Sequence, residues 1–188
     1  MLLVPCAVYA MEKAEVTFDW MLQDEDPSSV FRWGVKQYED KGMGVGPTAF
    51  SLGVIKGQRA ADIQKWPIVM IHQGQELVGF SALELLLEID NGIGLHITPL
   101  TDVVKEPKSI VALLAFIVAQ YPERTTAYTT VPKGPSALRQ LVVAQGFKST
   151  PDYKPNPLLC LKSQDNYDGF SKDLSALVGH TVAEGKEA

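Results

Sequence analysis

The sequence predicts an α/β protein of the α+β kind, in which helices flank a mixed, mostly antiparallel central sheet. Three observations support this fold class. Residues 67–87 alternate in hydrophobicity around a central turn, as the two strands of a hairpin do. Residues 106–122 are apolar nearly all round, which is typical of a helix buried against a sheet. The segments that follow have the composition of a strand, a helix and a strand, so helices and sheet should form layers.

The N-terminal quarter is expected to hold a strand and two helices. Residues 2–6 are apolar and predict a first strand, and residues 8–23 have a loose helical spacing. Residues 26–41 form a clearer helix, with an aspartate as N-cap, a proline in the first position and a glycine past the end. The glycine-rich residues 42–47 predict a loop that leads to a short strand near residues 48–55.

The remaining elements are delimited by turn residues and by changes of hydrophobic period. A turn at "HQGQ" separates the two hairpin strands, and "DNG" precedes the next strand. Gly146 should end a helix in the left-handed conformation, with Phe147 packed beneath that helix. The expected elements after the hairpin are a strand at 92–100, a helix at 106–122, a strand at 124–132, a helix at 134–146 and a strand at 158–163.

Length and composition favour one domain over residues 1–165, followed by a polar tail over residues 166–188 with at most one short helix. With 46% hydrophobic and 21% charged residues, the 188-residue chain can form an ordinary core. The net charge of −5 disfavours nucleic acid as the main partner. The longest apolar run is too short for a membrane span, and the first ten residues lack the basic start of a signal peptide.

Three segments between residues 76 and 148 resemble the GNAT superfamily of acyl-CoA N-acyltransferases. "ELVGFSALEL" is similar to the family's hairpin strand, and "GLHITPL" is similar to its central strand. "ALRQLVVAQGFK" is similar to its helix that ends in Gly-Phe. The resemblance covers about residues 67–161, and it implies a GNAT-like fold with acetyl-CoA as co-substrate and an amine as acceptor.

The resemblance also implies where acetyl-CoA would bind. Backbone N–H groups near the end of the central strand would hold the thioester, and those at the start of the next helix would hold the pyrophosphate. The family's glycine-rich pyrophosphate loop is replaced by the glycine-free "TDVVKEPKSI". The residues implied in cofactor binding are Ile97, Thr98, Lys105, Lys108, Ser109 and Ile110.

Three side chains are candidates for acid–base chemistry, which needs one group to deprotonate the amine and another to protonate the thiolate. His96 and Glu84 are the candidate bases. His96 could instead be a half-buried histidine bonded to a neighbour. Glu84 could instead lie at a strand end that emerges into water beside Glu88. Tyr128 is the candidate acid, because the tyrosine that many family members use would fall near Val142. Tyr128 could instead be a packed residue with a satisfied hydroxyl.

Two functions are compatible with these features. The first is an acetyl-CoA-dependent N-acetyltransferase with direct attack, since no cysteine lies in the matched strands. The alternative is a GNAT-like fold that acts as a non-catalytic protein-binding or inhibitory module. Two isolated cysteines predict a cytoplasmic protein without disulfides, and the scattered histidines predict no metal site. A homodimer or a protein target is a further expectation from the family.

Overall fold

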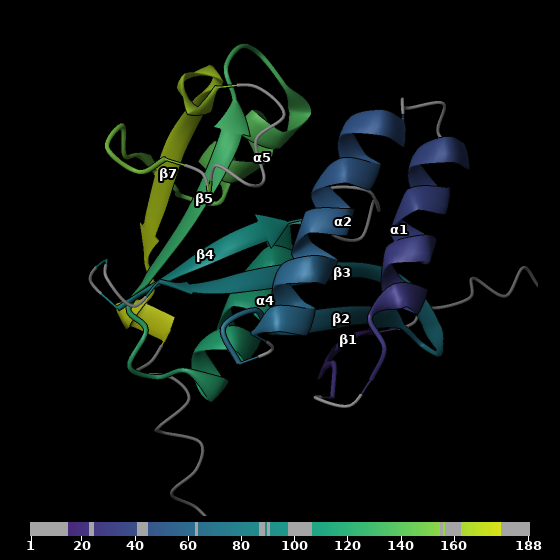
Figure 1. The fold of residues 1–188 in the computed structure, drawn as a ribbon. Coiled ribbons are helices and arrows are strands. Elements are labelled where there is room, and N and C mark those ends of the chain that lie inside the picture. Colours follow the sequence, from purple (N-terminus) through teal and green to yellow (C-terminus); the bar gives the residue numbers. More distant parts are fainter. Residues whose placement is uncertain are drawn as a thin grey trace, which may run out of the picture.

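A computed structural model of the chain describes residues 15–22, 25–40, 45–62, 64–86, 89, 91–97, 107–154, 156 and 163–177. Its centre is a seven-stranded sheet with the strand order β1-β2-β3-β4-β5-β7-β6 (Figure 1). The strands β4 and β5 pair in parallel, whereas every other neighbouring pair is antiparallel. The predicted mixed, mostly antiparallel sheet flanked by helices is therefore confirmed.

The first described element is the strand β1, Val16–Trp20, where the sequence suggested a helix over residues 8–23. Val16, Phe18 and Trp20 are half-buried, and the two residues between them are exposed. This alternation with period two, together with five paired residues along β2, outweighs the loose helical spacing. The strand expected at residues 2–6 lies outside the described residues.

The helix α1, Ser28–Asp40, confirms the prediction for residues 26–41. The carboxylate of Asp26 accepts a hydrogen bond from the backbone N–H of Ser28 at 2.9 Å, as an N-terminal cap does. Pro27 precedes the first helical residue, where its missing N–H costs nothing. This end of the helix is therefore encoded locally.

The helix α2, Val45–Ala61, replaces the loop and strand that we expected between residues 42 and 55. Leu52, Ile55 and Arg59 are buried, and their spacing of three and four residues follows one helix face. Pro47 lies in the first turn, where backbone N–H groups have no partner within the helix. The glycines suggested a loop, but the burial of one helix face against the sheet outweighs their low helix propensity.

Three antiparallel strands follow as predicted: β2 at Ile68–Gln73, β3 at Glu76–Leu86 and β4 at Gly92–Ile97. Gly74 turns the β2–β3 hairpin with a φ of 64°. Asn91 has a φ of 51° in the turn before β4. Asparagine tolerates this left-handed conformation better than most residues do.

The helix α4, Pro107–Gln120, crosses from β4 to the parallel strand β5, Thr126–Pro132. The helix α5, Ala137–Ala144, begins at Ser136, whose side chain accepts a hydrogen bond from the N–H of Arg139. It ends before Gly146, which has the expected left-handed φ of 78°. Phe147 is 4% exposed and belongs to the core, so the predicted corner is confirmed.

The sheet is completed by β6, Lys148–Ser149, a 3-10 turn at Gln164–Asn166, and β7, Tyr167–Asp173. We expected a polar tail from residue 166 and no strand there. Only Gly169 and Phe170 are buried in β7, so its sequence carries almost no alternation. Backbone pairing with all seven residues of β5 provides the order instead. The strand expected at residues 158–163 lies almost wholly outside the described residues.

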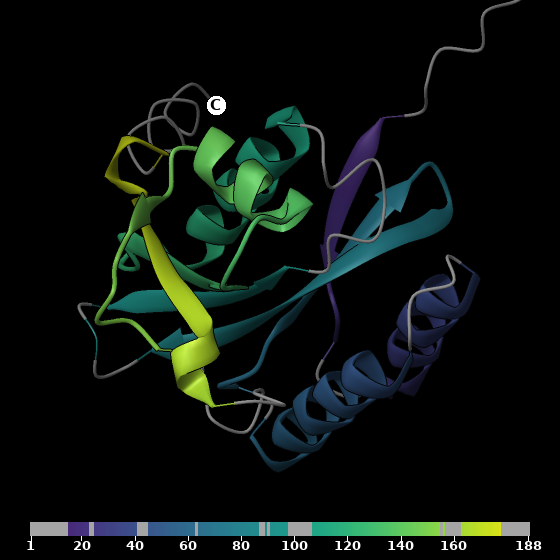
Figure 2. The same cartoon turned by 90° about the horizontal axis from the view of Figure 1, so that it is seen from above.

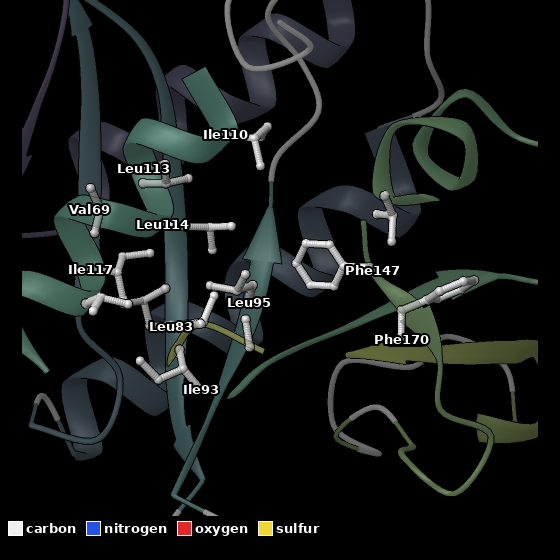
Figure 3. Close-up of a cluster of buried hydrophobic side chains, with 14 of the residues drawn as sticks. Val69, Leu83, Ile93, Leu95, Ile110, Leu113, Leu114, Ile117, Phe147 and Phe170 are labelled. Carbon is white, nitrogen blue, oxygen red and sulfur yellow. The ribbon is translucent and has the colours of Figure 1, made fainter. Parts of the chain in front are cut away.

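The helices cover both faces of the sheet (Figure 2). One core packs α4 and the end of α5 against β2–β5 and β7, and Figure 3 shows its side chains around Leu83, Leu95 and Leu114. The other core packs α1 and α2 against the opposite face, with Phe80 at its centre. Phe80 contacts Phe31 edge-on at 5.8 Å between ring centroids. The sheet is thus buried on both sides, which fixes the direction of each strand side chain.

Candidate active site

The parallel strands β4 and β5 separate after a short stretch of pairing. They share three rungs, and the last one joins Gly94 to Tyr128. Beyond it the two ribbons diverge, as Figure 1 shows. The hydroxyl of Thr129 donates a hydrogen bond to the carbonyl oxygen of Leu95 at 3.1 Å. A side chain thus satisfies a main-chain group at the point where the strand ladder opens.

Two of the predicted residues lie together at this opening. Glu84 is directly opposite Gly94 in the β3–β4 register, and Gly94 is opposite Tyr128 in the β4–β5 register. Their neighbours Leu83 and Leu95 pack against α4. Because side chains alternate along a strand, Glu84 and Tyr128 lie on the other face, the one that α1 and α2 cover. Glu84 and Tyr128 therefore flank the same rung.

Glu84 is half-buried and has a polar partner from a distant part of the chain. Its Oε1 accepts a hydrogen bond from the side-chain amide of Asn156 at 3.1 Å. A hydrogen bond that links residues 72 positions apart fixes the orientation of the carboxylate relative to the sheet.

Tyr128 packs against a second tyrosine, Tyr153. The ring centroids lie 4.7 Å apart with the planes tilted by 36°, and the two residues are 7% and 9% exposed. The hydroxyl of Tyr153 reaches the backbone of β4, since a Cβ on Gly94 would lie 3.1 Å from it. A Cβ on Gly92 would lie 2.5 Å from the ring of Tyr128. The sequence Gly-Ile-Gly thus lets both tyrosines lie directly on the strand.

Burial raises the pKa of Tyr153 above its ordinary value of 10.0, and the nearby Glu84 and Tyr128 raise it further. The phenol therefore keeps its proton at neutral pH. It can donate a hydrogen bond but cannot act as a base.

Tyr153 and Asn156 come from the segment 150–156, of which the structure describes residues 150–154 and 156, and which sequence reasoning did not assign to the site. Thr150 anchors the segment, because its N–H donates to the carbonyl oxygen of Gly169 in β7 at 2.8 Å. A Cβ on Gly169 would clash with the carbonyl oxygens of Thr150 and Tyr153. The available signal was an aromatic residue between two prolines, "PDYKP", in an otherwise polar stretch.

The other predicted site residues are placed only in part. His96 pairs with Ala82 and Ile97 with Ser81 along β3, and the side chains of these two β4 residues lie outside the description. Ile110 is 2% exposed and belongs to the core, so only its backbone could meet a ligand. Lys108 and Ser109 lie in the first turn of α4 with their side chains outside the description, and Thr98 and Lys105 lie outside the described residues altogether.

Val142 occupies the place where the resemblance implies a tyrosine. It lies on α5, is 2% exposed and belongs to the core. A valine there donates no proton. Any protonation of a leaving group must therefore use another donor.

Within the described ranges, no three His, Cys, Asp or Glu side chains gather as a metal site would require. No helix in the part of the chain that the structure describes is long and apolar enough to cross a membrane.

Solved acetyltransferase structures share this architecture. A protein assigned to the GNAT family from Desulfovibrio desulfuricans has a TM-score of 0.62 at 11% identity, over 85% of this chain and 99% of its own. An acetyltransferase from Thermus thermophilus has a TM-score of 0.59 at 17% identity, over 87% of this chain and 100% of its own. An aminoglycoside acetyltransferase in complex with coenzyme A has a TM-score of 0.59 at 14% identity, over 89% and 99%.

No protein-family model matches the sequence, and no curated protein matches it either. The structural likeness shows that the chain has the GNAT acetyltransferase fold, which confirms the resemblance in its sequence. At identities of 11–17%, this likeness shows the fold and not the activity.

Proposed function

We propose that this chain, which has the GNAT acetyltransferase fold, is an acetyl-CoA-dependent N-acetyltransferase whose amine acceptor attacks the thioester directly. The observation that carries the proposal is the opening between β4 and β5, with Glu84 and Tyr128 at its last paired rung. A carboxylate and a phenol at one place supply the two proton-transfer groups that the reaction needs.

The residues around the opening fit acetyl-CoA in two respects. First, β4 continues to Ile97 after its described pairing with β5 has ended at Gly94, so an amide-containing chain could pair with the backbone of the last residues of β4. Second, α4 begins at Pro107, and helix-start N–H groups at Lys108, Ser109 and Ile110 suit a phosphate. Lys105 and Lys108 would add positive charge there.

In the proposed reaction, the amine nitrogen forms a bond with the thioester carbonyl carbon, and the carbon–sulfur bond breaks. His96, or Glu84 through a water molecule, accepts the proton that the amine loses. Tyr128 or water donates a proton to the leaving thiolate. Backbone N–H groups around Ile97 would stabilise the oxyanion that forms between these steps.

Calorimetric titration with acetyl-CoA tests the proposal. We expect binding, and we expect the Lys105→Ala/Lys108→Ala variant to bind far more weakly, because two charges near the phosphates are lost. The matched control is Lys65→Ala/Lys133→Ala. It removes two exposed lysines, one shortly before β2 and one directly after β5. Equal affinity in both double variants would show that the phosphate site is misplaced.

The base is tested by Glu84→Gln and His96→Gln in an acetyl-transfer assay with a panel of small amines and a lysine peptide. The variant that lacks the base should lose about 10²–10⁴-fold in kcat while folding normally. A variant with full kcat at every pH excludes that residue from the role.

The alternative function is a non-catalytic binding or inhibitory module. Two observations favour it: residues 101–110 contain no glycine, and Val142 is a core residue. Under this alternative, millimolar acetyl-CoA produces no thermal stabilisation. We further propose a cytoplasmic location, with either a small molecule or a protein as the amine acceptor and with a homodimer as an assembly to test.

A further inference from the structure

We propose that Asn156 and Tyr153 are positioning residues of the reaction, which hold the Glu84 carboxylate at the last paired rung of β4 and β5. This inference rests on the proposed function, since positioning matters only if Glu84 takes part in acetyl transfer. It assigns a role to the segment Thr150–Asn156, which reaches the site from beyond β6.

Asn156 fixes the carboxylate from one side. Its amide donates to Glu84 Oε1 at 3.1 Å. A glutamate side chain has three rotatable bonds, and a half-buried one without a fixed partner could turn toward solvent. The amide therefore selects one orientation of the carboxylate, on the residue that pairs with Gly94.

Tyr153 borders the same place through two contacts, one with Tyr128 and one with Gly94. Its ring packs on Tyr128 at 4.7 Å, and its hydroxyl lies against Gly94. The Cβ of Glu84 borders the same place, because a Cβ on Gly94 would lie 3.4 Å from it. The raised pKa of Tyr153, to which the charge of Glu84 contributes, supports the same proximity. Tyr153 therefore places a protonated hydroxyl at Gly94, the residue that pairs with Glu84 in the β3–β4 register.

The turn at residues 150–153, which carries Tyr153 and comes shortly before Asn156 in the chain, is itself anchored on the sheet. Besides its N–H bond to Gly169, Thr150 forms a hydroxyl contact of 2.6 Å with Ser171 of β7. Tyr153 N–H donates to the carbonyl oxygen of Thr150 at 3.0 Å, which makes a compact turn. A rigid support of this kind is what an oriented carboxylate requires.

The proximity of Tyr153 to Glu84 can be tested without an activity assay. The protein is labelled with 3-fluorotyrosine, and the ¹⁹F resonance of residue 153, assigned with Tyr153→Phe, is followed through an alkaline titration. Glu84→Gln should lower the midpoint of this resonance, since a negative charge that disfavours the phenolate is removed. Asn156→Ala should lower the midpoint by less, because the carboxylate turns away. Asn166→Ala, which removes an exposed amide elsewhere, should leave it unchanged.

Kinetics then test the positioning role. Asn156→Ala and Gly94→Ala should each lower kcat by about 10²-fold, with the KM for acetyl-CoA unchanged. Gly94→Ala is informative because it removes no polar group and only displaces the Tyr153 hydroxyl, which lies 3.1 Å from the added methyl. Gly57→Ala, whose Cβ would meet nothing within 4 Å, is its matched control.

The possible failures are distinguishable. An unchanged midpoint in Glu84→Gln overturns this inference whether or not the protein transfers acetyl groups. Full kcat in Asn156→Ala also overturns it and leaves the proposed function intact. A wild-type protein that binds no acetyl-CoA overturns the proposed function, and the positioning role with it, even if the midpoint moves.

Discussion

Gly92 offers the sharpest test of how the candidate site is packed. A methyl group at this position would lie 2.5 Å and 2.8 Å from two ring atoms of Tyr128, and 3.0 Å from the carbonyl oxygen of Ile89. No real Cβ sits so close, so the ring must move. Tyr128 has little room, since it is 7% exposed and packs against the tilted ring of Tyr153.

The expected cost of Gly92→Ala follows from these distances. Overpacking a filled site by one methyl costs about 1–3 kcal/mol. Replacing glycine with alanine also lowers the conformational entropy of the unfolded chain, and this stabilises the folded protein by about 0.4–1 kcal/mol, which offsets part of the loss. The net loss should be about 1–2 kcal/mol, and in a chain of this size each kcal/mol lowers Tm by about 2–4 °C.

A double-mutant cycle, measured by denaturant unfolding, shows whether the Tyr128 ring causes this loss of stability. In the Tyr128→Ala background the ring is gone, so adding Gly92→Ala should cost little beyond the contact with Ile89. Gly53→Ala serves as control, because its Cβ would meet nothing within 4 Å and alanine stabilises a helix by about 1 kcal/mol relative to glycine. If Gly92→Ala costs the same with and without the Tyr128 ring, the proposed packing of this rung is wrong.

Three further predictions concern the surroundings of the site. Thr129→Val removes the donor to the buried carbonyl of Leu95 and should cost about 1–3 kcal/mol in urea unfolding, whereas Thr129→Ser should retain most of the stability. Gly146→Ala forces a side chain to a φ of 78° and should cost about 1–2 kcal/mol by calorimetry; a stable variant would contradict the left-handed cap. The pKa of Tyr153 is raised on folding, so its contribution to stability is complete below pH 10.0 and is lost as the pH rises toward the folded value. Stability should therefore fall above about pH 10, and the fall should be smaller in Tyr153→Phe; parallel curves would contradict this.

The elements with local signals could be predicted from the sequence. The cap at Asp26, the turn at Gly74 and the stop at Gly146 each need one residue type in one conformation. The strand β1 was predicted wrongly as a helix because its residues have a loose helical spacing, and the helix α2 was predicted wrongly as a loop and strand because of its glycines. In both segments the structure depends on burial against the sheet, which these local signals do not report. The strand β7 was missed for a related reason, since its order comes from backbone pairing with β5.

The candidate site could be predicted only where the chemistry lies on recognisable strands. Glu84 and Tyr128 were named from their strands, and the register places them at one rung. Tyr153 and Asn156 could not be found in this way, because their place depends on a long-range anchor between Thr150 and Gly169. Nothing in the local sequence of residues 150–156 indicates that contact.

The position of β7 in the sheet has a consequence for how the protein is made. Because β7 lies between β5 and β6, the last described strand to leave the ribosome must insert between two strands that were synthesised earlier. Until it does, β5 exposes an open edge, and the segment Thr150–Asn156 has no Gly169 to rest on. A nascent chain that stops before residue 167 would thus carry Glu84 and Tyr128 without their support. Completion of the sheet and support of the candidate site should therefore coincide, and a partly synthesised chain should be prone to associate through β5.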